Sequence, residues 1–489
     1  MKLSVLDQSV IPEGSTAATA LRNSLDLARL ADRLGYHRFW VAEHHATPSF
    51  AGPAPEIMVA RAAAETRRIR VGSGGVLLPY YSPLKVAEVF RVLSALDPGR
   101  IDLGIGRGAG AGSIEAHALA PGVPVDGGGE GFSGKLAELL AFLVDGFPEG
   151  QPAGQHFEES LRLAELADEL GFHHVKTVEH YFHEYGGYSP DPVTFLAAAA
   201  ARTSRVRLVT GAVLPAFTHP LKLAGKLAML DNISRGRLDV GFGRAFLPDE
   251  FAAFEVSMDE SRARFDEGVE AVRRLWAEED VVWKGTFHSF GPVTMLPRTW
   301  QRPHPRILVA TAKTPASAEA AGRAGYGVML VPSINPREQV QQTLAKYRAA
   351  AGAAGFEPGE EDVHMSYGCY VAEDGQEARV GGRQSSERAN RALAAAVSSW
   401  KDTRSADYPG YEKIVEKAGR GDFDRSVAER KTLVGTPEEV RAAIDDIRGW
   451  FGDFTISLQV ISGAMPFEEA ARTMRLFAEH VLPHYASND

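Results

Sequence analysis

The chain has 489 residues, enough to bury two hydrophobic cores or one large barrel with an appended unit. Apolar residues make up 44% and charged residues 24%, as in ordinary globular proteins, and the net charge of −10 argues against nucleic acid or an anionic membrane as a partner. Cys369 is the only cysteine, which excludes internal disulfides and cysteine-based metal clusters, and we assign no metal site.

The N-terminal residues 1–7 carry a lysine and an aspartate among short apolar residues. The acid interrupts the apolar run, so the segment does not match a secretory signal. No stretch reaches the roughly 18 apolar residues of a membrane span. We therefore expect a cytoplasmic protein without a membrane partner.

The first quarter of the chain alternates short buried strands with amphipathic helices. The strands are predicted at 2–6, 38–42, 69–78 and 101–106. Apolar residues at helical spacing follow the first and third of them, within 21–31 and 86–93. Such alternation predicts a parallel sheet with helices packed against it.

Two segments separate this part from the rest. Residues 121–131 are rich in glycine and proline and have the composition of a linker, and 147–152 form a second hinge. Between them, leucines at 136, 139, 140 and 143 have helical spacing.

The remainder of the chain alternates strands and helices over a much longer stretch. Seven strands are predicted, at 175–179, 206–214, 238–243, 306–311, 328–331, 363–370 and 455–460. A closed barrel of this kind needs an eighth strand. Residues 2–6, or 139–145 in an extended conformation, could supply it, and the sequence does not decide between them.

A polar stretch at 375–431 interrupts this series, with a glycine pair at 381–382. A segment of that length between two barrel strands is predicted to be a lid or partly disordered.

The two parts of the chain share sequence. Residues 24–35 and 160–171 are identical at nine of twelve positions, and the match extends to 41–45 against 177–181 and to 104–107 against 241–244. The first copy then stops. We expect a truncated half-barrel at 1–150, including its Gly-rich linker, and a complete barrel with the active site at 151–489.

The motifs of the second copy resemble those of the bacterial luciferase-like, flavin-dependent monooxygenases. They are Val178-Glu179-His180-Tyr181-Phe182, Val213-Leu214-Pro215, 231–237, Gly243-Arg244, Ser261-Arg262, 434–439 and 480–483. The first copy resembles the opening half of another branch, through 79–85 and 97–102. The resemblance implies an α/β fold: a TIM (β/α)8 barrel with an additional N-terminal half-barrel copy. It also implies oxidation of a small organic substrate by reduced FMN and O2. Luciferase proper has a reactive cysteine where this chain has Gly243, so light emission is not predicted.

The resemblance assigns the FMN phosphate to two arginines and a helix start. Arg244 and Arg262, with Thr314 and Ser317, occupy places equivalent to the family's phosphate ligands. Arginines give bidentate contacts to phosphate, and hydroxyls with N–H groups at a helix start bind anions. Thr314 as a simple helix cap, and Arg262 as a surface charge, remain the alternatives.

His180 is the candidate catalytic residue. The matching histidine of the family lies near the flavin and acts as a base or proton donor, work that suits a side chain titrating near neutral pH. A structural histidine at a strand end is the alternative. Glu179 points to the opposite face and is expected to pair with Arg or Lys in the barrel or to orient a neighbour. The loop with Tyr181, His183, Tyr185 and Tyr188 could stack on flavin or substrate, or could be packing.

Gly211 and Ala212 complete the predicted cofactor site. Barrels of this family often have a non-proline cis peptide at this strand end beside the flavin, and Gly74-Gly75 is the counterpart in the first copy. The alternative is that small residues merely allow close packing.

The first copy lacks a counterpart of Ser261-Arg262 and of the 314–317 loop. We therefore expect it to bind no flavin and to be unstable alone, because half a barrel leaves a strand edge open. It keeps the helices near 54–66 and 84–96, which make the family's dimer interface, so we expect an internal pseudo-dimer or a homodimer. No nicotinamide fingerprint is evident, which points to a separate flavin reductase as partner. Two alternatives stay open: a deazaflavin-dependent oxidoreductase and a non-catalytic flavin-binding relative. The substrate cannot be identified from the sequence.

Overall fold

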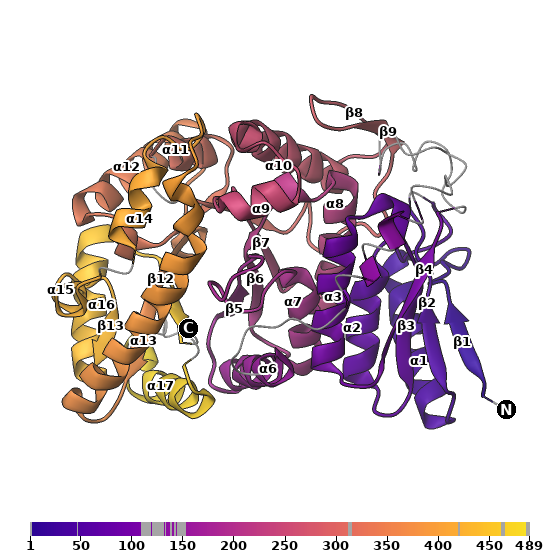
Figure 1. Cartoon of the computed structure of the whole chain (residues 1–489), viewed down its shortest axis with the longest axis horizontal. Coiled ribbons are helices and arrows are strands. Elements are labelled where there is room, and N and C mark those ends of the chain that lie inside the picture. The colour runs from indigo at the N-terminus through magenta and orange to yellow at the C-terminus, as the bar shows by residue number, and fades with distance from the viewer. Residues whose placement is uncertain are drawn as a thin grey trace.

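The fold is described from a computed structural model (Figure 1). It describes residues 2–45, 47–108, 153–311, 315–418, 421–460 and 465–485, and also 119, 132, 134–136, 139, 140 and 143. Two parallel sheets with their helices form two units side by side, with the N-terminal unit on the right of Figure 1. The predicted linker at 121–131 and hinge at 147–152 lie outside the described residues.

The N-terminal unit is a four-stranded parallel sheet in the order β1-β2-β3-β4. Its elements are β1 (Ser4–Asp7), α1 (Ala17–Arg33), β2 (Arg38–Val41), α2 (Pro55–Glu65), β3 (Arg70–Leu77), α3 (Pro83–Leu96) and β4 (Ile101–Gly106). One face of the sheet is buried, with Phe39, Val41 and Val71 fully inaccessible to solvent. At the edge of this sheet, in and next to β1, the side chains of Leu3 and Leu6 are about half exposed to solvent.

The main sheet carries the rest of the α/β pattern. Its strands follow the order β13-β12-β11-β10-β7-β6-β5, and β14 pairs with β12. Its strands are β5 (His174–Thr177), β6 (Arg207–Val213), β7 (Leu238–Phe242), β10 (Arg306–Ala310), β11 (Gly327–Leu330), β12 (Val363–Val371), β13 (Leu433–Gly435) and β14 (Thr455–Gln459). The helices around it are α6 (Ala153–Glu169), α7 (Pro192–Arg202), α8 (Pro220–Ser234), α9 (Pro248–Ala253), α10 (Ser261–Ala277), α11 (Pro315–Arg323), α12 (Arg337–Ala353), α16 (Pro437–Phe451) and α17 (Phe467–His480). The seven predicted strands are confirmed, with ends shifted by at most two residues.

The main sheet has an open seam between β5 and β14. Among the described strands β5 pairs only with β6, and β14 only with β12. Residues 2–6 do not fill the seam, because β1 pairs with β2 in the other sheet. Leu139 and Leu140 are helical, and the Leu143 N–H donates to the Leu139 carbonyl at 3.1 Å, so these described residues are not in the extended conformation that the other alternative required.

In its described residues the polar stretch at 375–431 is largely helical. It forms α13 (Gly375–Ala396), α14 (Ile414–Lys417) and α15 (Phe423–Ala428). The Asp374 side chain caps the start of α13 by accepting from the Glu377 N–H at 2.8 Å. The glycine pair at 381–382 allows close packing, because a Cβ on Gly381 would lie 2.2 Å from the Tyr370 ring. The antiparallel pair of β8 (Val281–Lys284) and β9 (Ser289–Val293) was not predicted from the sequence.

The two units pack through their helices. Helix α2 contacts α7 and α8, α3 contacts α6 and α7, and α1 contacts α8. The buried residues on both sides form one continuous hydrophobic cluster, from Ala20 to Ile307. The predicted helices near 54–66 and 84–96 are α2 and α3, and both lie in this contact. None of the helices in the described part of the chain is long and apolar enough to cross a membrane.

Candidate functional site

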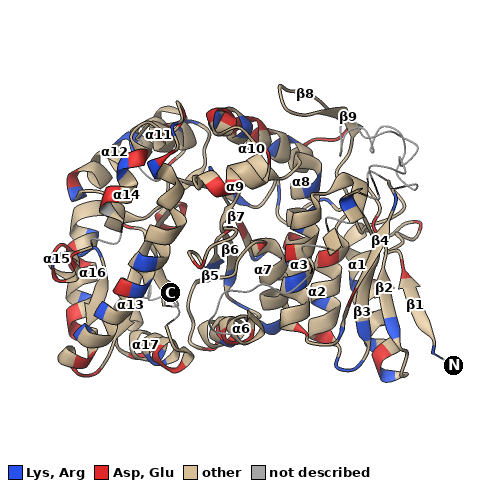
Figure 2. Cartoon of the chain, in the orientation of Figure 1, with Lys and Arg blue, Asp and Glu red and all other residues tan. Residues whose placement is uncertain are grey.

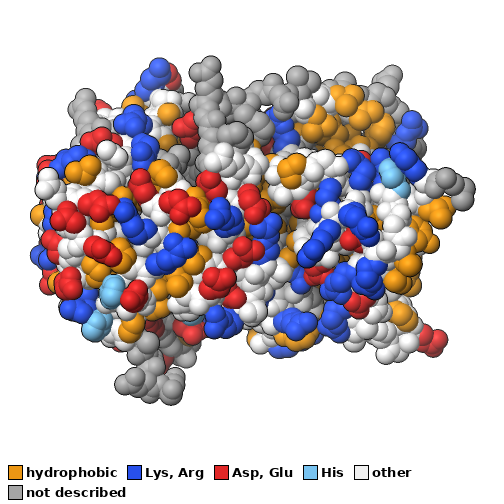
Figure 3. Space-filling model, turned by 90° about the horizontal axis from the view of Figure 1, so that it is seen from below, with side chains coloured by type: hydrophobic (Ala, Val, Ile, Leu, Met, Phe, Trp, Pro, Cys, Tyr) orange, Lys and Arg blue, Asp and Glu red, His pale blue; other side chains and the backbone are white. Residues whose placement is uncertain are grey.

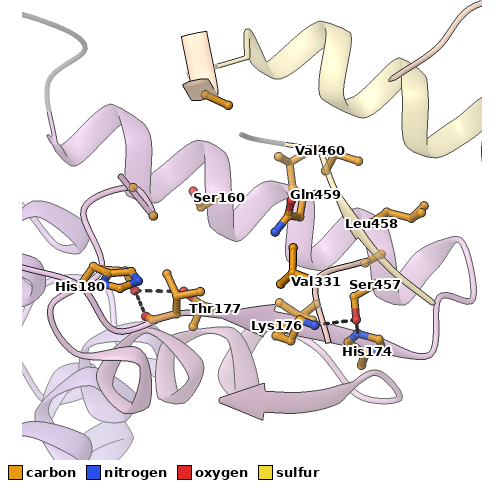
Figure 4. A pocket seen from close by; sticks show the side chains of 18 of the residues that line it. Ser160, His174, Lys176, Thr177, His180, Val331, Ser457, Leu458, Gln459 and Val460 are labelled. Carbon is orange, nitrogen blue, oxygen red and sulfur yellow. Dashed lines mark hydrogen bonds between the residues drawn. The ribbon is translucent and has the colours of Figure 1, made fainter. Parts of the chain in front are cut away.

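A cavity of about 1480 Å³ lies against the main sheet and reaches its C-terminal edge (Figure 4). It is lined by all of β5, by the loop that follows β5, by all of β14 and by α13. His180, Tyr185 and Tyr188 line it at the C-terminal end of the strands. Active sites of parallel barrels lie at this edge, where loops follow each strand.

His180 is held by a carboxylate on a neighbouring helix. Its Nδ1 lies 3.0 Å from Oε1 of Glu250 in α9, and the same oxygen accepts from the Tyr181 N–H at 3.0 Å. Glu250 is fully buried. This contact fixes the ring so that Nε2 is the nitrogen left to exchange a proton in the cavity. Sequence reasoning missed Glu250, whose position 70 residues away gives no local signal.

The aromatic loop after β5 has two roles. Tyr185 lies 4.9 Å from the His180 ring between centroids, and Tyr188 lies 5.4 Å from His156. Both line the cavity, whereas Tyr181 is buried beneath it. Tyr181 therefore supports the loop, and Tyr185 and Tyr188 are placed to meet a ligand.

Glu179 is paired with a lysine from the other unit. Its carboxylate accepts from the Tyr181 hydroxyl and from the Leu214 N–H at 3.1 Å, and lies 3.8 Å from Nζ of Lys85 in α3. Burial raises the pKa of Glu179 despite this lysine. Lys85 Nζ also donates to the Tyr181 hydroxyl at 2.8 Å and to the Pro190 carbonyl. Glu179 is paired with a basic residue as predicted, but this residue comes from the N-terminal unit and not from the barrel.

Glu88, one turn after Lys85, gives a testable pH dependence. Burial raises its pKa to about 8, and its Oε2 is buried without a hydrogen-bond partner. Between pH 4.5 and 8 the folded state therefore holds a proton that the unfolded state has lost, so this residue's contribution to stability falls as the pH rises. We expect Glu88→Gln to stabilise the chain at pH 8 by on the order of 2 kcal/mol. At pH 5 it should have little effect. Urea unfolding at the two pH values measures this difference, and an equal shift at both would contradict it.

The wall of the cavity on β5 and β14 is polar. Lys176 Nζ donates to Ser366 Oγ at 2.7 Å and to Ser457 Oγ at 2.8 Å, and His174 Nε2 lies 2.8 Å from Ser457 Oγ (Figure 4). Burial lowers the pKa of Lys176 to about 7. These side chains point into the barrel interior, below His180.

The cis peptides at the two equivalent strand ends are confirmed. Gly211–Ala212 at the end of β6 and Gly74–Gly75 in β3 are both non-proline cis bonds. Gly211 has no room for a side chain, because an added Cβ would lie 2.4 Å from Lys176 Cγ. Gly211 thus packs against Lys176 of the cavity wall, whereas neither Gly211 nor Ala212 lines the cavity itself.

The structure brings Arg244 and the start of α10 together around an acidic residue. Arg244 Nε donates to Ser261 Oγ at 3.2 Å, and its Nη2 donates to the Asp407 carbonyl at 3.0 Å and lies 3.9 Å from the Asp407 carboxylate. That carboxylate accepts from the Arg262 N–H at 2.7 Å. The Arg244 guanidinium also lies over the Tyr408 ring, 4.6 Å from its centroid. Arg244 and the N-terminus of α10 therefore already hold an anion.

The other two predicted phosphate ligands are Thr314 and Ser317. Thr314 lies outside the described residues, and Ser317 lies in the first turn of α11. Arg244, Arg262 and Ser317 do not line the cavity that contains His180, whereas Arg388 and Arg391 of α13 do. The sequence analysis did not identify Arg388, Arg391 or Asp407 as residues of the site.

The N-terminal unit has histidines and an arginine at the positions predicted to match this motif. The His44 ring stacks on Phe50 at 4.2 Å, and His45 Nε2 lies 2.6 Å from Glu43. Arg107 lies over the Phe132 ring at 5.3 Å. These contacts are internal to the N-terminal unit.

Acidic and basic side chains are interspersed along the helices and over the face of the molecule seen from below (Figures 2 and 3).

Comparisons with known proteins agree with this architecture. The family model of luciferase-like monooxygenases matches residues 1–130 and 138–453. The crystal structure of the monooxygenase RslO1 from Streptomyces bottropensis is 84% identical over 70% of this chain and 97% of its own, with a TM-score of 0.64. The oxygenating constituent of 3,6-diketocamphane monooxygenase from Pseudomonas putida, in complex with FMN, shares the fold, at 20% identity over 68% of this chain and 94% of its own, with a TM-score of 0.57.

Curated relatives match parts of the chain. The N-acetyl-S-alkylcysteine monooxygenase of Bacillus subtilis is 50% identical over 30% of this chain, and the match spans only 44% of that enzyme. The oxygenase component of a flavin-dependent trigonelline monooxygenase from Acinetobacter baylyi is 34% identical over 47% of this chain and 63% of its own length. With a family match over nearly the whole chain, and a barrel edge carrying the expected histidine, this chain belongs to the luciferase-like monooxygenase family of flavin-dependent enzymes.

Proposed function

We propose that this monooxygenase uses reduced FMN and O2 to oxidise a small organic substrate. The observation that carries the proposal is His180 on the cavity wall, held by the buried Glu250, in a barrel with a non-proline cis bond at Gly211–Ala212. Reduced flavin, when bound, supplies the electrons that activate dioxygen. His180 holds or moves a proton at Nε2, Glu250 orients the ring, and the aromatic loop excludes water.

The FMN phosphate is assigned to Arg244, Arg262, Thr314 and Ser317. The donors fit an anion, because Arg244 and the N-terminus of α10 hold the Asp407 carboxylate. In this assignment the phosphate takes the place of that carboxylate, and the segment around Asp407 and Tyr408 moves aside. Gly211 and Ala212 then lie beside the flavin ring.

Two substitutions test the phosphate assignment. Arg244→Gln should weaken FMN binding by about tenfold or more, because a charge-assisted contact is lost. Asp407→Asn should tighten binding, because the competing carboxylate loses its charge. Arg391→Gln, on the cavity wall, is the matched control and should change binding little. Fluorescence titration with FMN measures all three. If only the control weakens binding, the phosphate lies at α13 instead.

A separate reductase is proposed as the source of reduced FMN. The similarity to an oxygenase component of a flavin-dependent monooxygenase supports a two-component system. The direct test is consumption of O2 by the purified chain with FMN and an added flavin reductase, compared with the reductase alone. An oxidised product should form only when the chain and the flavin reductase are both present.

The second candidate is a deazaflavin-dependent oxidoreductase on the same barrel. A coenzyme F420-dependent reductase from Methanopyrus kandleri shares the fold at 20% identity, with a TM-score of 0.52. Parallel titration with reduced FMN and reduced deazaflavin discriminates the two. Binding of FMN without any turnover would instead favour the non-catalytic relative.

The N-terminal unit is proposed to be a truncated copy that acts as an internal dimer partner. In this proposal α1, α2 and α3 correspond to α6, α7 and α8. The contacts between the units are then symmetric, as in a dimer: α2 packs on its counterpart α7, and the contact of α1 with α8 corresponds to that of α6 with α3. Lys85 and Lys222 are equivalent in sequence, and each reaches across the contact, Lys85 to Tyr181 and Lys222 to the Tyr80 carbonyl at 2.6 Å. In this proposal residues 1–150 carry no active site of their own, and a homodimer is the alternative.

A further inference from the structure

Lys176 places an amine inside the barrel, where it lines the cavity that also contains His180. Its Nζ reaches across the interior from β5, donating to Ser366 Oγ in β12 at 2.7 Å and to Ser457 Oγ in β14 at 2.8 Å (Figure 4). Its stem packs on Gly211, where an added Cβ would lie 2.4 Å from Lys176 Cγ. An ammonium has three N–H donors, and the described residues provide no partner for the third.

Lys176 differs from the lysines buried between the two units because no carboxylate faces it. Lys85 lies 3.8 Å from Glu179, and Lys226 lies 3.3 Å from Glu56. No carboxylate of the described residues forms an ion pair with Lys176, and burial alone lowers its pKa to about 7. An ammonium removed from bulk water is stabilised by a counter-charge, which a carboxylate ligand in the cavity would supply.

The side chains next to Lys176 suit a negatively charged ligand. His174, two residues earlier on β5, lies 2.8 Å from Ser457 Oγ through Nε2, and its ring centroid is 5.1 Å from that of His364 in β12. Burial, and after it the nearby basic side chains, lower the pKa of both histidines. The more distant charges that act on these two rings are those of His173, Arg207, Arg306 and Lys176. In the described part of the chain, the groups that face Lys176 are therefore neutral or basic.

The cavity continues from Lys176 to His180. The two residues are four positions apart, so their Cα atoms are at most roughly 13 Å apart, at about 3.3 Å per extended residue. Val331 and Val460 give this part of the cavity apolar walls, and Gln459 adds a carboxamide (Figure 4). A ligand that is charged at one end and apolar along its length therefore matches the cavity.

We propose that Lys176, Ser457 and His174 bind the carboxylate of a small organic acid whose apolar body extends towards His180. The Lys176 ammonium donates its third N–H to one carboxylate oxygen. With His174 Nε2–H donating to Ser457 Oγ, the Ser457 hydroxyl donates to the other oxygen. The proposal concerns binding in the apo chain and does not rest on the proposed flavin chemistry.

Calorimetric titration of the full-length chain without flavin tests the ligand class. Hexanoate should bind at least about tenfold more tightly than hexanamide, which has the same length without the charge, and than acetate, which lacks the apolar body. Lys176→Met keeps the length of the side chain and should weaken hexanoate binding by about tenfold or more. Arg391→Gln removes another cation from the cavity wall and is the matched control, so its affinity should be unchanged.

Three results would overturn the proposal. They are the absence of hexanoate binding, equal binding of hexanamide, and a folded Lys176→Met variant with unchanged affinity. Acetate or inorganic phosphate binding as tightly as hexanoate would also overturn it, because the cluster would then hold any small anion.

Proton uptake gives a second reading that needs no variant. At pH 8 the Lys176 amine is largely neutral, and a bound carboxylate favours its ammonium form, so hexanoate binding should take up roughly one proton. Titrations in two buffers with different ionisation enthalpies measure this uptake, and binding without it would overturn the role of Lys176. Since no flavin is present in either measurement, failure of this proposal leaves the FMN assignment standing, and failure of FMN to bind leaves the carboxylate site standing.

Discussion

His180→Ala is expected to lower kcat by about 10²- to 10⁴-fold, the usual contribution of a positioned acid–base group. The ring is held by Glu250 with its other nitrogen towards the cavity, so its removal deletes the proton-transfer group and leaves the cavity walls in place. Binding of reduced FMN should change little, because His180 contacts none of the proposed phosphate ligands. Stopped-flow turnover and flavin titration measure the two effects separately.

Glu250→Gln is the matched control for a positioning role. A glutamine can still accept from the Tyr181 N–H and hold the ring, so the loss in kcat should be much smaller than for His180→Ala. Unchanged turnover in His180→Ala would remove His180 from the catalytic machinery and leave it as a structural histidine.

A chain shortened to residues 151–489 is expected to aggregate or to lose activity. The cluster from Ala20 to Ile307 is shared by both units, and α7 contributes fully buried Leu196 and Ala197 to it. Removing the N-terminal unit exposes a contiguous apolar face, and such faces cause association. Size-exclusion chromatography with light scattering measures the state of the shortened chain. A soluble, monodisperse and fully active product would overturn the pseudo-dimer proposal.

Variants of the full-length chain distinguish the packing between the two units from the support that Lys85 gives to the loop carrying His180. Met58→Glu places an unpaired charge in the contact between units and should sharply reduce soluble protein, whereas Leu30→Glu at an exposed position should not. Lys85→Met keeps most of the packing volume but removes the contacts to Tyr181 and Pro190. It should leave the chain folded and lower activity, because the loop that carries His180 loses its support.

Strand and helix positions were predictable because each buried strand is a short apolar run bounded by glycine, proline or charge. The strand-end position of His180 and the Gly211–Ala212 cis bond were also predictable, because the family motifs mark both. The partner of Glu179 was not, because Lys85 comes from the N-terminal unit, 94 positions away, and not from the barrel. The fold of the stretch at 375–431 was not predictable either. Its glycine pair packs against Tyr370, 11 residues before Gly381, and against Val434, 52 residues after Gly382, so the stretch's own sequence does not reveal this packing.

The missed site residues share the same physical cause. Glu250 acts on His180 across 70 positions, and Asp407 acts on Arg262 across 145. Neither belongs to a motif whose spacing carries chemical meaning, so only the folded chain brings the pairs together. The phosphate assignment remains a prediction for the same reason, since it depends on which anion Arg244 holds in solution.

The contact of Lys85 with the loop that carries His180 has a further consequence. In a dimer of separate chains such a contact is lost on dilution, and specific activity falls with enzyme concentration. Here both partners are on one chain, so their association is intramolecular and their effective concentration is fixed by the connecting segment. Specific activity should therefore stay constant from micromolar to nanomolar enzyme.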